Sequence, residues 1–167
     1  VVEEGVTQTG QEITALVAEN FLQEKAASSI MCKSVGCDIF PIDVGVARDV
    51  RIFNRKIAYG TKNMTKEPAM TREQAIRAIE IGIEAAQMMK EKGYHILATG
   101  EMGIGNTTTS SAVASVLLDI PVERMTGRGA GLSTEGLNRK ITAIKKAIAL
   151  HQPDKTDAID VLSKVGV

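Results

Sequence analysis

Aromatic side chains are scarce in this chain: they make up 3% of its 167 residues, and tryptophan is absent. Proteins that bind single-stranded nucleic acid stack bases on aromatic rings, so no such platform is expected here. Neither sign of charge is in excess, because 20 Lys and Arg residues balance 20 Asp and Glu residues. That balance argues against the basic surface typical of nucleic-acid-binding proteins. The composition therefore predicts no nucleic-acid partner.

Cysteines are few, and long apolar runs are absent. Cys32 and Cys37 are the only cysteines. They are too few for a disulfide scaffold and have no companions at metal-ligand spacing, so both are predicted to be free thiols. Neither a signal peptide nor an apolar stretch long enough to span a membrane is visible. We therefore expect a cytoplasmic protein that does not contact membranes.

Hydrophobic periodicity predicts helices that alternate with strands. This order predicts an α/β fold: a largely parallel sheet flanked by helices, with a Rossmann-like three-layer core, in a single domain over residues 1–167. Ligands of such folds bind beyond the carboxyl ends of strands. Helices are expected at 11–23, 26–35, 71–92, around 112–118, at 133–152 and at 157–164, and strands at 37–46 and 94–98.

Local signals refine these elements. Thr71 and Gln74 form the pattern of a capping box, and Ile76, Ile79 and Ile83 mark the expected buried face of the helix that follows. Pro41 interrupts the first strand and therefore predicts an edge strand or an irregular one. The adjoining basic segment, residues 47–70, has no clear period, so it is interpreted as either a functional loop or a solvated surface.

The stretch Gly100–Ser111 carries the strongest functional signal, Gly-Glu-Met-Gly-Ile-Gly-Asn-Thr-Thr-Thr-Ser-Ser. It joins an expected strand to an expected helix, and helix N-termini bind anions through free N–H groups and a positive dipole end. Glycines let the backbone approach a ligand, and the Asn and Thr side chains offer hydrogen bonds to phosphate. The alternative interpretation is an ordinary strand-to-helix turn.

A second glycine-rich stretch, Thr126–Gly131, follows that helix. It could lie against a ligand or be a flexible turn. On the next expected helix, Lys140 falls beside the apolar stripe, where its ammonium either points toward a ligand or reaches back to solvent. His95 and His151 have no partner pattern and are interpreted as structural. The residues alone therefore predict an α/β enzyme that holds a phosphorylated small molecule.

Three motifs together resemble the nicotinate-nucleotide–dimethylbenzimidazole phosphoribosyltransferase family of cobalamin nucleotide-loop assembly. They are Gly100–Thr108, Thr126–Leu132 and Asn63–Met70, and the similarity runs in order along almost the whole chain. The resemblance implies transfer of the 5-phosphoribosyl group of nicotinate mononucleotide to 5,6-dimethylbenzimidazole. The products would be α-ribazole 5′-phosphate and nicotinate. It also implies a homodimer that uses no metal and no cofactor.

The resemblance further assigns roles by position. Glu101 would act at the ribose and Lys140 near the reacting groups, both as catalytic residues. Gln11 and Met102 would border the base pocket. The phosphate and ribose would be bound by Gly103, Ile104, Gly105, Asn106, Thr107 and Thr108, and the nicotinate side would be lined by Gly127, Arg128, Gly129 and Gly131.

The chain also departs from the family pattern. Members are about twice as long, a Gly-Asp-His-Gly segment that normally precedes the position of Val1 is absent, and the family's general base is a glutamate in the C-terminal part. We therefore expect a domain that is incomplete at both ends relative to the family. Two alternatives stay open: a nucleotide-binding sensor without catalysis, and a sister transferase that uses adenine or a phenol.

Overall fold

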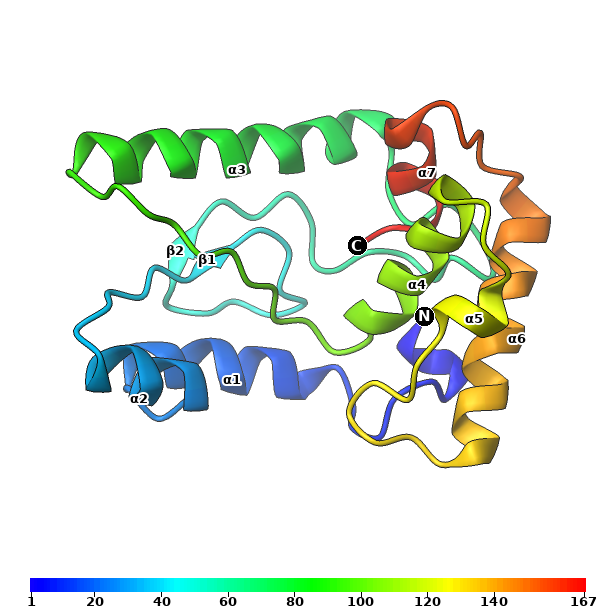
Figure 1. Cartoon of the computed structure of the whole chain (residues 1–167), viewed down its shortest axis with the longest axis horizontal. Coiled ribbons are helices and arrows are strands. Elements are labelled where there is room, and N and C mark those ends of the chain that lie inside the picture. Colours follow the sequence, from blue (N-terminus) through cyan, green and yellow to red (C-terminus); the bar gives the residue numbers. More distant parts are fainter.

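The computed structural model describes residues 1–167 and consists of helices and one short parallel sheet of two strands (Figure 1). The helix α3 runs along one side, α1 and α2 lie on the opposite side, and the two strands lie between them. The elements in chain order are η1 (Val2–Glu4), α1 (Glu12–Leu22), α2 (Ala27–Ser34), β1 (Ile42–Asp43), β2 (Phe53–Asn54), α3 (Arg72–Glu91), α4 (Asn106–Leu117), α5 (Val122–Met125), α6 (Thr134–His151) and α7 (Ala158–Val165). The α/β class and its parallel pairing are confirmed.

Local capping explains where the long helices begin. Thr71 Oγ1 accepts a hydrogen bond from the Gln74 amide at 3.2 Å, and the Thr71 amide donates to Gln74 Oε1 at 2.9 Å, which confirms the predicted capping box. Ser133 caps α6 by accepting from the Gly136 amide at 3.1 Å. Gly93 follows the end of α3 with φ +90°, as expected of a glycine beyond a helix C-terminus.

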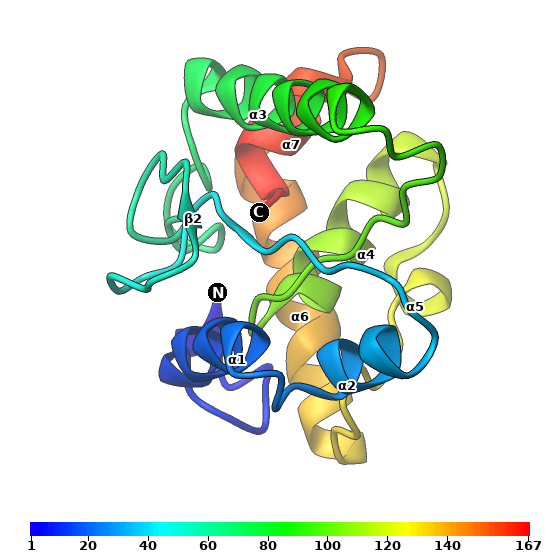
Figure 2. The ribbon, with the colours of Figure 1, turned by 90° about the vertical axis from the view of Figure 1, so that its left-hand side faces the viewer.

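The hydrophobic core lies where α4, α6 and α7 meet. These helices pack on one another (Figures 1 and 2), and the segment before α3 contributes the fully buried Met64 to the same core. His151, at the end of α6, contacts the Met64 carbonyl at 2.8 Å through Nε2, which supports a structural role. The buried members of the core are Met64, Ala69, Ala112, Val122, Ile144, Ala147, Val161 and Val165. No helix is both long and apolar enough to span a membrane.

The strands differ most from the expectation. Of the strand predicted at 37–46, only Ile42–Asp43 forms, paired in parallel with Phe53–Asn54 inside the segment predicted to be aperiodic. The stretch 94–98 was predicted as a buried strand, and this is wrong for the described structure: it forms no strand, and Ile96 is 89% exposed. A strand needs a hydrogen-bonded neighbour, and no backbone group between His95 and Met102 has a hydrogen-bond partner in the chain.

The helix α3 packs through a face other than the predicted one. Ile76, Ile79 and Ile83 are exposed, whereas Ala75, Ile81 and Met89 are buried. The reason lies in its neighbours: α3 contacts α7, and most of its length projects beyond that contact (Figure 1). Hydrophobic periodicity identified the helix correctly but could not tell which of its apolar residues meet a neighbour.

Candidate functional site

The glycine-rich stretch leads into a helix, as predicted, but α4 begins at Asn106, within the stretch, and not near residue 112. Gly105 is the N-cap with φ +99°, a left-handed conformation that side chains with a Cβ rarely adopt. The Thr108 amide donates to the Gly105 carbonyl at 2.9 Å, whereas the Thr107 amide has no acceptor in the chain. The first turn of α4 therefore presents a free N–H group at the positive end of the helix dipole, which favours an anion.

A contact with α1 fixes the loop before α4. The Ile104 amide donates to Thr14 Oγ1 at 3.0 Å, so this donor is already used within the protein. Thr14 is buried on α1. The motif alone could not reveal this anchor, because Thr14 lies 90 residues earlier and no local pattern marks it. Within the first turn, Thr107 is exposed and Thr108 is fully buried, with an Oγ1 that has no partner.

Glu101 lies over the loop that it begins. The Asn106 side-chain amide donates to its Oε2. A Cβ at Gly103 would come within 2.6 Å of Glu101 Oε1, so the bare backbone of Gly103 is what makes room for the carboxylate. Part of the side chain reaches solvent, yet desolvation by the surrounding protein raises the pKa of Glu101 to about 7. Near neutral pH this carboxyl can therefore exist in either protonation state.

Lys140 on α6 supplies the positive charge of the site. The residue is only 1% exposed. Its Nζ donates to Thr107 Oγ1 at 2.8 Å and to the Gly127 carbonyl at 3.1 Å, and both of these partners are neutral. Burial lowers the pKa of Lys140. An ammonium that is buried among neutral oxygens lacks a counter-charge, which an anion bound at Thr107 would supply.

The second glycine-rich stretch forms a wall beside Lys140. A Cβ at Gly129 would lie 2.9 Å from Thr107 Oγ1 and 3.5 Å from Lys140 Nζ, so this backbone packs directly on the contact between the two side chains. Arg128 turns away and donates to the Leu132 carbonyl at 2.8 Å. Gly131, whose carbonyl accepts from the Gln8 side chain, ends the wall. The structure thus brings Lys140, Thr107 and Gly127–Gly129 together, although they come from three separate segments.

The two residues assigned to the base pocket come from different segments, Met102 from the glycine-rich loop and Gln11 from the start of α1. Met102 is half-buried next to Glu101. Gln11 is the N-cap of α1, three residues before Thr14, and it is exposed. A Cβ at Gly60 would come within 3.0 Å of Gln11 Nε2, so the loop that contains Gly60 packs against this amide. That contact was not predicted, because the loop has no periodic pattern.

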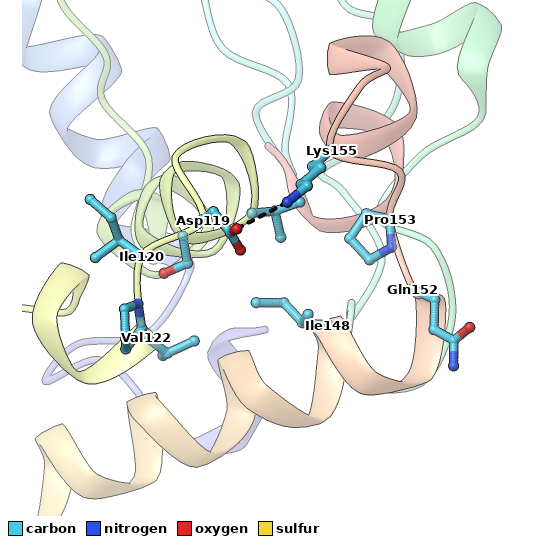
Figure 3. Close-up of a pocket in the computed structure, with 10 residues that line it drawn as sticks. Asp119, Ile120, Val122, Ile148, Gln152, Pro153 and Lys155 are labelled. Atoms are coloured by element: carbon cyan, nitrogen blue, oxygen red, sulfur yellow. Dashed lines mark hydrogen bonds and ion pairs between the residues drawn. The ribbon is translucent and has the colours of Figure 1, made fainter.

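A separate hollow lies away from these residues, between the C-terminal end of α4, α5 and α6 (Figure 3). Its volume is about 540 Å³, and Ile120, Val122 and Ile148 contribute apolar walls. The charges at its rim, Lys155 and Asp119, pair with each other at 2.9 Å. No group of three or more His, Cys, Asp or Glu side chains is arranged to hold a metal ion. The glycine loops around Lys140 therefore remain the candidate site.

Comparison with known proteins identifies the family of this chain. A family model described as "Phosphoribosyltransferase" matches residues 1–167. The chain therefore belongs to this phosphoribosyltransferase family. Among curated relatives, it is 52% identical to the nicotinate-nucleotide–dimethylbenzimidazole phosphoribosyltransferase of Acetivibrio thermocellus, over 99% of this chain and 48% of that protein. The enzyme of the same name from Clostridium tetani is 49% identical over 99% of this chain and 47% of its own length.

Solved structures give the same result. The crystal structure of CobT from Thermus thermophilus matches with a TM-score of 0.93 and 39% identity, covering 99% of this chain and 51% of that one. A second structure from that organism, titled as a nicotinate-nucleotide–dimethylbenzimidazole phosphoribosyltransferase, matches with a TM-score of 0.87 and 36% identity, covering 99% of this chain and 50% of that one. The resemblance inferred from the three motifs is confirmed. The chain spans about half the length of the curated relatives it matches.

Proposed function

We propose that this chain carries the nucleotide-binding part of an enzyme that transfers the 5-phosphoribosyl group of nicotinate mononucleotide to 5,6-dimethylbenzimidazole. The products are α-ribazole 5′-phosphate and nicotinate. The names of the relatives and the family match support this reaction. The observation that carries the proposal in this chain is the buried Lys140 ammonium, which contacts Thr107 at the N-terminus of α4 and has no acidic partner.

The 5′-phosphate is the group that this arrangement fits best. It would accept from the free Thr107 amide, lie at the positive end of α4, and balance the charge of Lys140. The backbone of Gly129 would close the site from the other side. Charge-assisted hydrogen bonds are about twice as strong as neutral ones, so a phosphate held by Lys140 and an amide is oriented as well as bound.

Glu101 lies next in the loop and would act at the ribose. As nicotinate leaves, its pyridinium nitrogen becomes neutral and C1′ develops positive charge. An ionised carboxylate close to C1′ stabilises that charge. Because the pKa of Glu101 is about 7, the ionised form is gained as the pH rises through neutrality. The benzimidazole nitrogen attacks from the opposite face, which inverts the anomeric centre.

The incoming benzimidazole must lose a proton, and the family resemblance places the general base in a segment outside these 167 residues. General-base catalysis contributes about 10²–10⁴-fold, so we expect the 167-residue chain by itself to bind nucleotide and to have little transferase activity. We further propose that the enzyme is a cytoplasmic homodimer, as the family resemblance implies.

Calorimetric titration of the chain tests the phosphate site. Nicotinate mononucleotide should bind, and nicotinate riboside, which lacks the phosphate, should bind at least about tenfold more weakly, since a hydrogen bond to a charged group contributes about 1.5–3 kcal/mol. Lys140→Met should weaken mononucleotide binding by about tenfold to a hundredfold and barely affect the riboside.

The matched control is Lys145→Met. Lys145 lies on the same helix, is exposed, and pairs with Glu123 at the surface. This substitution should leave both affinities unchanged. Equal affinity of the parent chain for mononucleotide and riboside would contradict the phosphate assignment. An unchanged affinity in Lys140→Met would contradict the role of Lys140.

A further inference from the structure

The ammonium of Lys56 lies inside a cage of oxygen atoms in the segment between β1 and α3. The Lys56 side chain is 9% exposed. Its Nζ donates to the Val46 carbonyl at 2.6 Å and to the Arg48 carbonyl at 2.5 Å, and it lies 3.2 Å from Asp43 Oδ2. The Tyr59 ring centroid is 4.2 Å from the same nitrogen. The two carbonyls accept two of the three ammonium protons, and the Tyr59 ring adds a cation–π contact. Asp43 supplies a buried counter-charge, and the exposed Asp49 has its Oδ1 3.9 Å from the same nitrogen.

Asp43 makes this cage depend on a positive charge. The residue is 1% exposed at the end of β1. Its Oδ1 accepts from the Val46 amide at 2.8 Å, which is the local bond of a turn residue. Its Oδ2 is buried and accepts no hydrogen bond, so the contact with Lys56 provides its only counter-charge. Removing Lys56 leaves the buried Asp43 carboxylate without a counter-charge, whereas removing Asp43 leaves Lys56 with only the exposed Asp49, at 3.9 Å.

The cage joins the two segments that leave the short sheet. The Arg55 amide donates to the Asp43 carbonyl at 2.8 Å, and the Ile57 amide donates to the Val44 carbonyl at 2.9 Å. These bonds continue the parallel pairing beyond β1 and β2, and Lys56 lies between them in sequence. The ammonium thus holds the turn after β1 against the segment that follows β2, in the loop region that lies between α1 and α3 in Figure 1.

That segment continues to Gly60, which lies against Gln11. The backbone of Gly60 has φ +83°, and a Cβ there would be 3.0 Å from Gln11 Nε2 and 3.6 Å from Ala47 Cβ. Ala47 belongs to the turn that the cage holds, between the two residues whose carbonyls Lys56 binds. The position of the surface beneath Gln11 therefore depends on the same ammonium.

We propose that Lys56 is a positioning residue for the aromatic-base side of the site: its caged ammonium fixes the loop Asp43–Gly60 so that Gln11 faces the incoming nitrogen base in one orientation. This inference rests on the proposed function and on the base-pocket role that the family resemblance implies for Gln11. A side chain that is held before binding loses less conformational freedom when the ligand arrives, so the cage raises affinity for the base without touching it. Nucleotide binding at Lys140 uses other segments and does not depend on the cage.

The test compares Lys56→Met with Lys62→Met in the 167-residue chain. Lys62 belongs to the same region but is exposed and pairs with Glu67 at 2.7 Å. Amide hydrogen exchange reports loop order directly. In Lys56→Met we expect the Val46 and Ile57 amides to exchange at least about tenfold faster, while amides within α6 keep their protection. In Lys62→Met all of these amides should exchange as in the parent.

Calorimetry measures ligand affinity, which a purely structural role of Lys56 would not change selectively for one ligand. Lys56→Met should weaken binding of 5,6-dimethylbenzimidazole by about tenfold and leave nicotinate mononucleotide within about twofold, since only the base side loses its preorganisation. Unchanged exchange at Val46 and Ile57, or an equal loss of both affinities, would overturn the proposal. If the parent binds mononucleotide but no base, this inference fails while the nucleotide half of the proposed function stands.

A second variant covers the case in which Lys56→Met does not fold. Asp43→Asn combined with Lys56→Met removes both buried charges, so no unpaired charge remains to destabilise the chain. We expect the double variant to fold, with the same fast exchange and the same selective loss of base affinity. If this double variant also fails to fold, the pair is required for folding and not for placing Gln11, and the proposal is overturned.

Discussion

The raised pKa of Glu101 makes the stability of this chain depend on pH in a way that one substitution can test. Desolvation raises this pKa from 4.5 to about 7. Below about pH 4.5 the carboxyl is protonated in both the folded and the unfolded chain, so burial has little cost. As the pH rises to about 7, the unfolded chain loses the proton first and is favoured. Stability attributable to Glu101 is therefore lost over this interval and does not recover above it.

The magnitude follows from the size of the shift. A shift from 4.5 to about 7 corresponds to at most roughly 3 kcal/mol. The side chain reaches solvent, which screens the effect, so we expect about 1–2 kcal/mol. Glu101→Gln keeps the shape of the side chain and has no charge to desolvate. The variant should therefore be more stable than the parent by about 1–2 kcal/mol near pH 8.5 and equal to it near pH 4.

Urea unfolding followed by circular dichroism at both pH values measures this difference. Glu12→Gln, which changes an exposed carboxylate on α1, should unfold as the parent does at each pH. A loss of stability in Glu101→Gln that is the same at both pH values would refute the reasoning. It would mean that the bond from Asn106, and not desolvation, determines the energy of this carboxyl. In the complete enzyme the same variant should lower turnover more than it raises the Michaelis constant, because the charge acts in the transition state.

Two further predictions concern the loop and the exposed surface. Gly105→Ala should destabilise the chain by about 1–2 kcal/mol and weaken mononucleotide binding, because the φ of +99° at this position disfavours a residue with a Cβ. The control, Gly82→Ala in the open middle of α3, should instead stabilise the chain by about 0.5–1 kcal/mol, and urea unfolding measures both changes. Ile96→Asp should reduce concentration-dependent self-association, which sedimentation velocity measures. Ile96 is 89% exposed beside the half-exposed Leu97, on a stretch whose backbone groups are unpaired. Unchanged association would show that another surface is responsible.

The helices were predictable because their signals are local. The capping box of Thr71 and Gln74 and the cap at Ser133 lie within a few residues of the helix starts that they define. The sheet was not predictable in the same way. Pairing of Ile42 with Phe53 depends on a partner outside the strand itself, and Phe53–Asn54 has no alternation that marks it as a strand. Conversely, the apolar stretch around Ile96 has the pattern of a strand but no partner in the chain.

The candidate site was likewise predictable in its local motifs and not in its long-range contacts. The motif spacing identified the glycine loops, and the helical position of Lys140 left open whether its ammonium points toward a ligand or reaches back to solvent. Neither could show that Lys140 donates to Thr107, because that contact joins residues 33 positions apart. The anchor from Thr14 to the Ile104 amide, 90 residues apart, was beyond any pattern in the sequence. Contacts of this length are determined by how α4 and α6 pack together and by where α1 lies against the loop before α4.

Three glycines show why some of these contacts could be recognised from a sequence motif and others could not. At Gly103, Gly129 and Gly60, a Cβ would come within 2.6 to 3.0 Å of a polar side-chain atom of another residue. In each case the absent side chain is what lets a functional group pack on bare backbone. Gly103 and Gly129 stand among other glycines, so they form visible motifs. Gly60 stands alone in an aperiodic segment, and only the packing of Gln11 on it connects the Lys56 cage with the proposed site.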